Sequence, residues 1–222
     1  MAYKSILTCL AGAAELDRTL PGAIRFAATR EAHLSACLLG VDMTPAGGFS
    51  MGVSPLLLQE TLERAQTDAE ALEARAKALL AGESLRWGTE SAVAAFGGLS
   101  ALVGLRARFS DLVVQTRPYG EGSEASQVAV IEAALFEGRA PVLVLPDGTL
   151  PEAFGQRIMI AWNQSNEALS AVRRALPLLQ EADAVQVVVV DDDGCAKGVV
   201  ALLDVMRAML SLPMRYSSKF PH

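Results

Sequence analysis

The residues best suited to chemistry lie in a loop between a buried strand and a helix. Residues 111–123 read "DLVVQTRPYGEGS". Arg117 could pair with an anion, and the backbone amides of Gly122 and Ser123 could receive one where the next helix begins. The loop also has a purely structural interpretation, in which Ser123 caps the helix and Gly120 and Gly122 shape the turn. Both interpretations stay open at this point.

The nucleotide- and dinucleotide-binding motifs of enzymes are missing from the chain. The sequence has no GxxxxGK[ST] loop. Asp42 follows a strand, where a dinucleotide enzyme would hold a ribose, but no G-x-G-x-x-G precedes it. With only two histidines and three cysteines, none at metal-ligand spacing, we expect neither a metal site nor an enzyme.

Composition narrows the class of protein. The 222 residues are 51% hydrophobic with a net charge of −6, which suits a globular core and disfavours nucleic-acid binding. No apolar run is long enough to cross a bilayer, so we expect no membrane association. An odd number of cysteines without a disulfide pattern fits a reducing compartment, and we expect a cytoplasmic location.

The hydrophobic pattern predicts five strands that alternate with four helices. The strands are apolar on both faces, as in a parallel sheet with helices on each side. Serine and proline at 54 and 55 predict the start of a long helix that ends near Gly82. The fold class is therefore α/β, an open, doubly wound five-stranded parallel sheet. The expected strands are 5–10, 34–42, 85–90, 111–116 and 141–146, with helices at 17–30, 54–82, after 90 to about 108, and 122 to about 136.

The pattern then restarts on a smaller scale. We predict an α/β domain over residues 1–146, a linker rich in proline and glycine over 147–156, and a truncated second unit with a divergent tail over 157–222. Strand, helix and strand recur in the second unit, which makes it an incomplete βαβ unit. Ser165 and Asn166 are expected to cap its helix, and a further helix is expected around 199–210.

The stretches "RIMIAWNQSNEALSAVRRALPLL" and "SDLVVQT…VIEAALFEGRAPVLVLP" resemble the universal stress protein family in a tandem arrangement, with the second unit cut short. The resemblance implies a Rossmann-like sheet. Many members of that family bind ATP and others bind no nucleotide. In ATP-binding members an Asp ends the first strand, and G-x2-G-x9-G-[ST] follows the fourth.

This chain departs from the family pattern at both positions. Ala11 stands where the acidic residue would be, and no two glycines are three residues apart. Glu121 also places a negative charge where a triphosphate would lie. The resemblance therefore implies a degenerate nucleotide site. Its positions are Ala11, Asp42, Arg117, Gly120, Gly122 and Ser123.

Three functions follow as hypotheses. The favoured one is a non-enzymatic universal stress-type protein that acts as a homodimer, with an unknown protein partner and no cofactor, and with or without a small ligand. The resemblance implies pairing through the last strand, 141–146. The second is a stress regulator that binds an adenine nucleotide, ATP or AMP, at the divergent site. The third is a weak nucleotide hydrolase.

Overall fold

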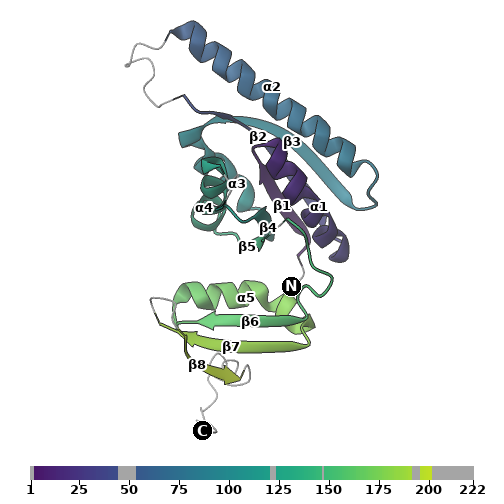
Figure 1. Ribbon diagram of the computed structural model, residues 1–222, viewed down its shortest axis with the longest axis vertical. Coiled ribbons are helices and arrows are strands. Elements are labelled where there is room, and N and C mark those ends of the chain that lie inside the picture. Colours follow the sequence, from purple (N-terminus) through teal and green to yellow (C-terminus); the bar gives the residue numbers. More distant parts are fainter. Residues whose placement is uncertain (1–2, 45–53, 121–123, 147, 192–195, 202–222) are drawn as a thin grey trace. The chain divides into compact units, whose positions relative to one another are not determined.

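The computed structural model describes residues 3–44, 54–120, 124–146, 148–191 and 196–201 (Figure 1). The chain divides into two compact units, with the division between Leu150 and Pro151. The first unit holds a five-stranded sheet whose strands are β1 (Ser5–Leu10), β2 (His33–Asp42), β3 (Arg86–Ala95), β4 (Leu112–Thr116) and β5 (Val142–Leu145).

The strand order is β3-β2-β1-β4-β5, and every pair of neighbours is parallel. This order places the first strand at the centre, as in Rossmann-like sheets. The predicted fold class is confirmed. β4 is buried along its whole length and β1 along nearly all of it, because helices cover both faces of the sheet there.

Two helices cover each face. α1 (Ala13–Thr29) and α2 (Pro55–Leu80) lie on one face, and α3 (Leu99–Ala107) and α4 (Ala125–Glu132) lie on the other (Figure 1). A π-helical turn, η2 (Ala133–Glu137), continues α4, and a 3-10 turn, η1 (Phe96–Gly98), precedes α3. The face under α3 and α4 contains a cluster of buried aliphatic side chains with the thiols of Cys9 and Cys37.

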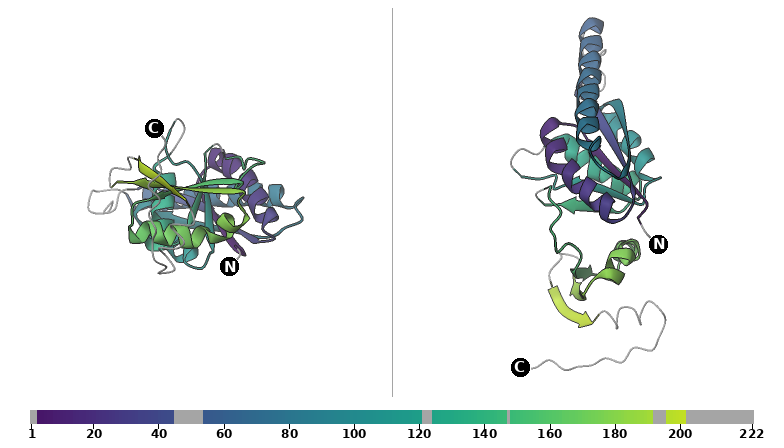
Figure 2. Two further views of the ribbon diagram at one scale, coloured as in Figure 1. Left: turned by 90° about the horizontal axis from the view of Figure 1, so that it is seen from below. Right: turned by 90° about the vertical axis from the view of Figure 1, so that its right-hand side faces the viewer.

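The start of α2 follows the sequence prediction. The Ser54 hydroxyl accepts a hydrogen bond from the Leu56 amide at 3.3 Å, and Pro55 is the first helical residue. The buried residues of α2 begin only at Ala65, so its first turns extend past the sheet, as the right-hand view of Figure 2 shows. The helix meets β2 at Gly40, where an added Cβ would lie 1.9 Å from the Ala65 carbonyl oxygen.

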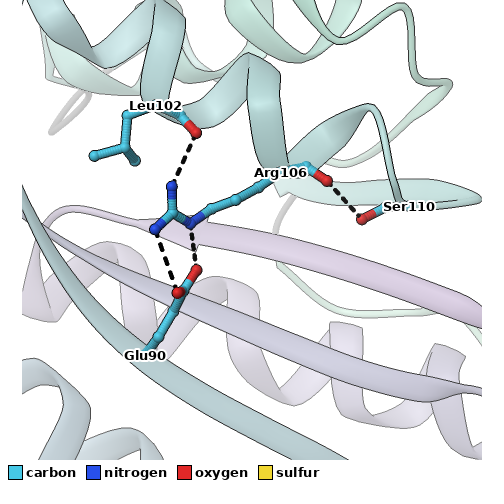
Figure 3. Close-up of polar contacts among 4 residues, drawn as sticks. All are labelled: Glu90, Leu102, Arg106 and Ser110. Carbon is cyan, nitrogen blue, oxygen red and sulfur yellow. Dashed lines mark hydrogen bonds and ion pairs between the residues drawn. The ribbon is translucent and has the colours of Figure 1, made fainter.

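Arg106 ties α3 to the edge of the sheet (Figure 3). Its guanidinium binds both carboxylate oxygens of Glu90 on β3 and donates to the Leu102 carbonyl oxygen at 3.1 Å. The Ser110 hydroxyl donates to the Arg106 carbonyl oxygen at 3.2 Å. Since these contacts engage the guanidinium, Arg106 is a structural residue rather than an anion receptor.

Three boundaries in the first unit differ from prediction, the first being the start of α1, which is at Ala13 rather than at 17. β3 does not end at Glu90 but continues to Ala95, because the ten residues of β2 pair with it along their full length. Tertiary pairing thus outweighs the weak strand propensity of its alanine-rich end. The N-cap of α4 is Glu124 rather than Ser123, and Gly122 and Ser123 lie outside the described residues.

The second unit begins as predicted and ends differently. It contains β6 (Arg157–Trp162), α5 (Asn166–Glu181), β7 (Ala184–Val190) and β8 (Ala196–Ala201). β6 and β7 are parallel, and the Ser165 hydroxyl caps α5 by accepting from the Ala168 amide at 3.0 Å. The helix expected around 199–210 is wrong at its start, because 199–201 belong to β8, which pairs with β7 in the antiparallel sense. Residues 202–210 lie outside the described residues.

No helix in the described part of the chain has the length and apolar character needed to span a membrane.

Candidate functional site

The carboxyl ends of β1 and β4 lie where the winding of the sheet reverses. From β1 the chain builds outward to β2 and β3, and then returns to place β4 and β5 on the other side. Ligands of open α/β sheets bind at this point. Ala11 directly follows β1 and Arg117 directly follows β4, so the structure brings these two predicted positions to the same end of the sheet.

Asp42 does not join them. In the register of β1 and β2, Leu10 lies level with Leu38, four residues and about 13 Å before Asp42. The Asp42 carboxylate instead closes a local turn, accepting from the Thr44 hydroxyl at 2.6 Å and from its amide at 2.9 Å. These hydrogen bonds hold the pKa of Asp42 below its ordinary value. Asp42 is therefore a turn residue at the end of β2.

Arg117 and Gly120 lie close to each other. The Arg117 amide donates to the Leu145 carbonyl oxygen at 3.3 Å, which fixes the start of the loop to β5. Gly120 has a φ of 119°, a conformation that favours glycine. The Arg117 side chain folds back over it, with Nη2 3.6 Å from the position of an added Cβ. The loop thus keeps its arginine beside a glycine that shapes the turn.

A buried acid that the motifs did not predict lies beside Ala11. Glu15 is in the first turn of α1 and is only 3% exposed. Its Oε2 accepts a hydrogen bond from the Ala11 amide at 2.8 Å. Burial, as the largest cause, and the nearby Glu124 raise the pKa of Glu15, the Ala11 amide and Arg18 lower it, and the net pKa is about 7. An acid therefore does stand beside the end of β1, four residues later than the family pattern places it.

A second carboxylate approaches the same turn from α4. Gly12 is the N-cap of α1, and an added Cβ there would lie 3.7 and 4.0 Å from the two carboxylate oxygens of Glu124. The Ser126 hydroxyl donates to Glu124 Oε2 at 3.5 Å. The turn formed by Ala11 and Gly12 is thus lined by two carboxyl groups, a poor environment for the phosphates of a nucleotide.

Buried uncharged side chains link the end of β4 to its neighbours. The Thr19 hydroxyl donates to the Thr116 hydroxyl at 3.2 Å, and both are buried. The Gln115 side chain donates to the Cys9 carbonyl oxygen at 2.8 Å. The first hydrogen bond joins α1 to β4, and the second joins β4 to β1.

Neither described cysteine is a nucleophile. Cys9 and Cys37 are register partners on β1 and β2, both are fully buried and both are free. A hydrogen bond with Cys37 and burial raise the pKa of the Cys9 thiol well above its ordinary value. Its thiol stays protonated and unreactive at neutral pH. Nor do three or more His, Cys, Asp or Glu side chains gather to hold a metal ion among the described residues.

Glu15 lies before the helix predicted at 17–30, so its position within a helix was seen only when α1 proved to begin at Ala13. It lies four residues before Thr19 and eleven before Phe26, on the face of α1 that the apolar spacing buries. A charged residue on such a face, in the first turn of a helix at the carboxyl end of a strand, is a candidate site residue. Glu124 gave no signal in the sequence, because its approach to Gly12 depends on the packing of α4.

No protein-family model matches the sequence, and no curated protein matches it. The structure is similar to universal stress protein UspA from Lactobacillus plantarum, with a TM-score of 0.50 and 16% identity, covering 66% of this chain and 99% of that one. It is also similar to a universal stress protein from Burkholderia pseudomallei, with a TM-score of 0.44, 20% identity, and coverage of 64% and 96%. A third is a universal stress protein in complex with cAMP, with a TM-score of 0.33, 18% identity, and coverage of 66% and 99%. The likeness to the first shows that the five-stranded fold is that of universal stress proteins.

Proposed function

We propose that this chain is a non-enzymatic universal stress-type protein that acts through dimerisation and protein contacts, with a nucleotide site that has degenerated. The fold supports the class of protein. The observation that carries the proposal is the chemistry of the β1–α1 turn. Where ATP-binding members of the family have a single Asp at the end of the first strand, the carboxyl groups of two residues, Glu15 and Glu124, lie against Ala11 and Gly12.

Electrostatics supports the loss of the site. The arginine of the loop, Arg117, is the one predicted site residue with a positively charged side chain. Its attraction for an anion is opposed by the negative charge of Glu124 and, at a pH above the pKa of Glu15, by that of Glu15. An incoming triphosphate would meet like charge at close range in a partly desolvated site, where repulsion costs several kcal/mol (about 4 kcal/mol for two unit charges 4 Å apart at an effective dielectric constant of 20).

The absence of reactive groups supports a non-enzymatic role. The Cys9 thiol is protonated, the Asp42 carboxylate is held in a turn, and the Arg106 guanidinium is bound to Glu90. The described part of the chain thus offers the strand-end crevice no activated nucleophile. The free, buried thiols of Cys9 and Cys37 are in keeping with a reducing compartment, and we propose a cytoplasmic location.

The proposal is tested by the small molecules that the protein carries. Protein purified without added nucleotide is denatured, and the released molecules are identified by mass spectrometry. A parallel sample is incubated with ATP and desalted before denaturation, which measures retention directly. We expect both samples to release far less than one nucleotide per chain. Stoichiometric ATP or AMP would contradict the proposal and favour the nucleotide-binding regulator, and turnover of ATP with magnesium would favour the hydrolase.

A further inference from the structure

The carboxyl group of Glu15 is enclosed at a junction of three elements. It belongs to the first turn of α1, it accepts from the amide that follows β1, and it is 3% exposed. One turn later on the same face, Thr19 binds Thr116 at the end of β4. A change in the charge of Glu15 therefore acts inside the packed interface between α1 and the two central strands rather than on the surface.

Glu124 connects this junction to α4. It is the N-cap of α4, and it lies 109 residues after Glu15 in the chain. Its carboxylate lies beside Gly12, the residue that follows Ala11, where an added Cβ would be 3.7 and 4.0 Å from the two carboxylate oxygens. The Glu124 carbonyl oxygen also accepts a hydrogen bond from the Gln127 amide at 3.0 Å, which closes the first turn of α4. The position of the Glu124 carboxylate and the first turn of α4 are thus linked.

The charges that act on Glu15 are few. On α1 itself, Arg18 favours the ionised form, and on α4 Glu124 opposes it. β1 contributes the Ala11 amide and the neutral thiol of Cys9, and the end of β4 contributes the uncharged Gln115 and Thr116. With burial as the largest influence, the pKa of Glu15 is about 7. The group therefore changes charge close to neutral pH.

We propose that the β1–α1 turn is a proton-operated switch, in which the neutral carboxyl of Glu15 allows Glu124 to hold the first turn of α4 against Gly12, and ionised Glu15 drives that turn away. The switch works because the carboxylates of Glu15 on α1 and Glu124 on α4 both lie against the same backbone turn, Ala11 and Gly12. Loss of the proton leaves two like charges there, of which one is buried and fixed to the Ala11 amide. Because Glu124 is the N-cap of α4, the response of the molecule to rising pH is expected at the first turn of α4.

Hydrogen exchange of the Gln127 amide tests the switch. Exchange is followed by NMR between pH 6 and 8 and corrected for the intrinsic pH dependence of the chemistry. In the wild type we expect protection to fall about tenfold as Glu15 ionises, the effect of a coupling of one pK unit. Glu15→Gln keeps the acceptor for Ala11 but cannot ionise, and Glu124→Gln removes the second charge. In both variants protection should be independent of pH.

Glu132→Gln, at the far end of α4, is the matched control and should keep the fall seen in the wild type. Protection that is constant in the wild type, or that falls equally in Glu15→Gln, would overturn the proposal. If Glu15→Gln does not fold, the decision rests on Glu124→Gln and on the carboxyl ¹³C titration of Glu15 in the wild type. The titration must then have its midpoint near pH 7 and must move to lower pH when Glu124 is replaced.

Discussion

At Glu15, burial and charge oppose each other, and the balance sets a pH dependence of stability. In the folded chain its pKa is about 7, against 4.5 for the exposed group. The native state therefore binds this proton more tightly than the unfolded state. The contribution to stability is fully present below about pH 4.5, falls as pH rises, and is lost above about pH 7. The difference in pKa corresponds to about 3 kcal/mol.

We expect the free energy of unfolding of the wild type, measured by denaturant titration relative to Glu15→Gln, to decrease by about 3 kcal/mol from pH 4.5 to 7. The comparison isolates Glu15, because carboxyls with lowered pKa, such as Asp42, change stability in the opposite sense at lower pH and are present in both proteins. Glu60→Gln, an exposed position on α2, should leave the slope unchanged. Parallel curves for the wild type and Glu15→Gln would show that the carboxyl is not desolvated as described.

Residues were harder to predict than elements, for a physical reason. Local sequence indicated Arg117 and Gly120, because turn chemistry and strand ends are short-range properties, and the family resemblance indicated Ala11. Asp42 was misassigned to the crevice, since its place depends on how far β2 extends beyond β1. Glu124 escaped notice because its contact with Gly12 joins segments more than a hundred residues apart. Periodicity carries no information about such contacts.

At the scale of elements, the sequence predicted order and type well, and lengths less well. The alternation of apolar strands and amphipathic helices reproduced all five strands of the sheet. The prediction failed where the free edge of a strand offered backbone hydrogen-bond partners to residues with weak strand propensity. Pairing with β2 extends β3 to Ala95, and pairing with β7 places residues 199–201 in the strand β8. Val199 and Val200 are β-branched, which favours a strand once an edge is available.

The packing of α2 on β2 depends on one glycine. An alanine at position 40 would place its Cβ 1.9 Å from the Ala65 carbonyl oxygen and 2.7 Å from its carbonyl carbon. These are backbone atoms in the middle of a helix and cannot move aside alone, so the whole helix must shift. We expect Gly40→Ala to reduce the free energy of unfolding by about 3 kcal/mol, measured by urea titration.

Gly82 provides the matched control for that substitution. It follows α2, and an added Cβ there would meet nothing within 4 Å. Gly82→Ala should be neutral or stabilise by about 0.4–1 kcal/mol, because alanine restricts the unfolded chain. Equal effects of the two substitutions would show that α2 does not approach β2 as closely as the structure has it.

At the scale of the whole molecule, the edge of the first sheet is where we expect copies to associate. β5 pairs with β4 on one side, and within the described residues no strand pairs with its other side. The Val144 side chain is 40% exposed at this edge. An apolar edge strand with free backbone groups tends to seek a partner. We therefore expect the homodimer to form through β5.

Val144→Lys should separate the copies, because pairing through β5 would bury an ammonium group without a counterion. We expect the dimer dissociation constant to rise on the order of a hundredfold, measured by native mass spectrometry and analytical ultracentrifugation. Leu56→Lys is the control. That side chain is 74% exposed on α2, the helix that packs on β2 and β3 toward the opposite edge of the sheet, so it should leave the dimer intact. A dimer that survives Val144→Lys and dissociates with Leu56→Lys would move the interface from β5 to α2. A wild type that is monomeric at micromolar concentration would remove dimerisation from the proposed function. The loss of the nucleotide site would still be judged by its own experiment.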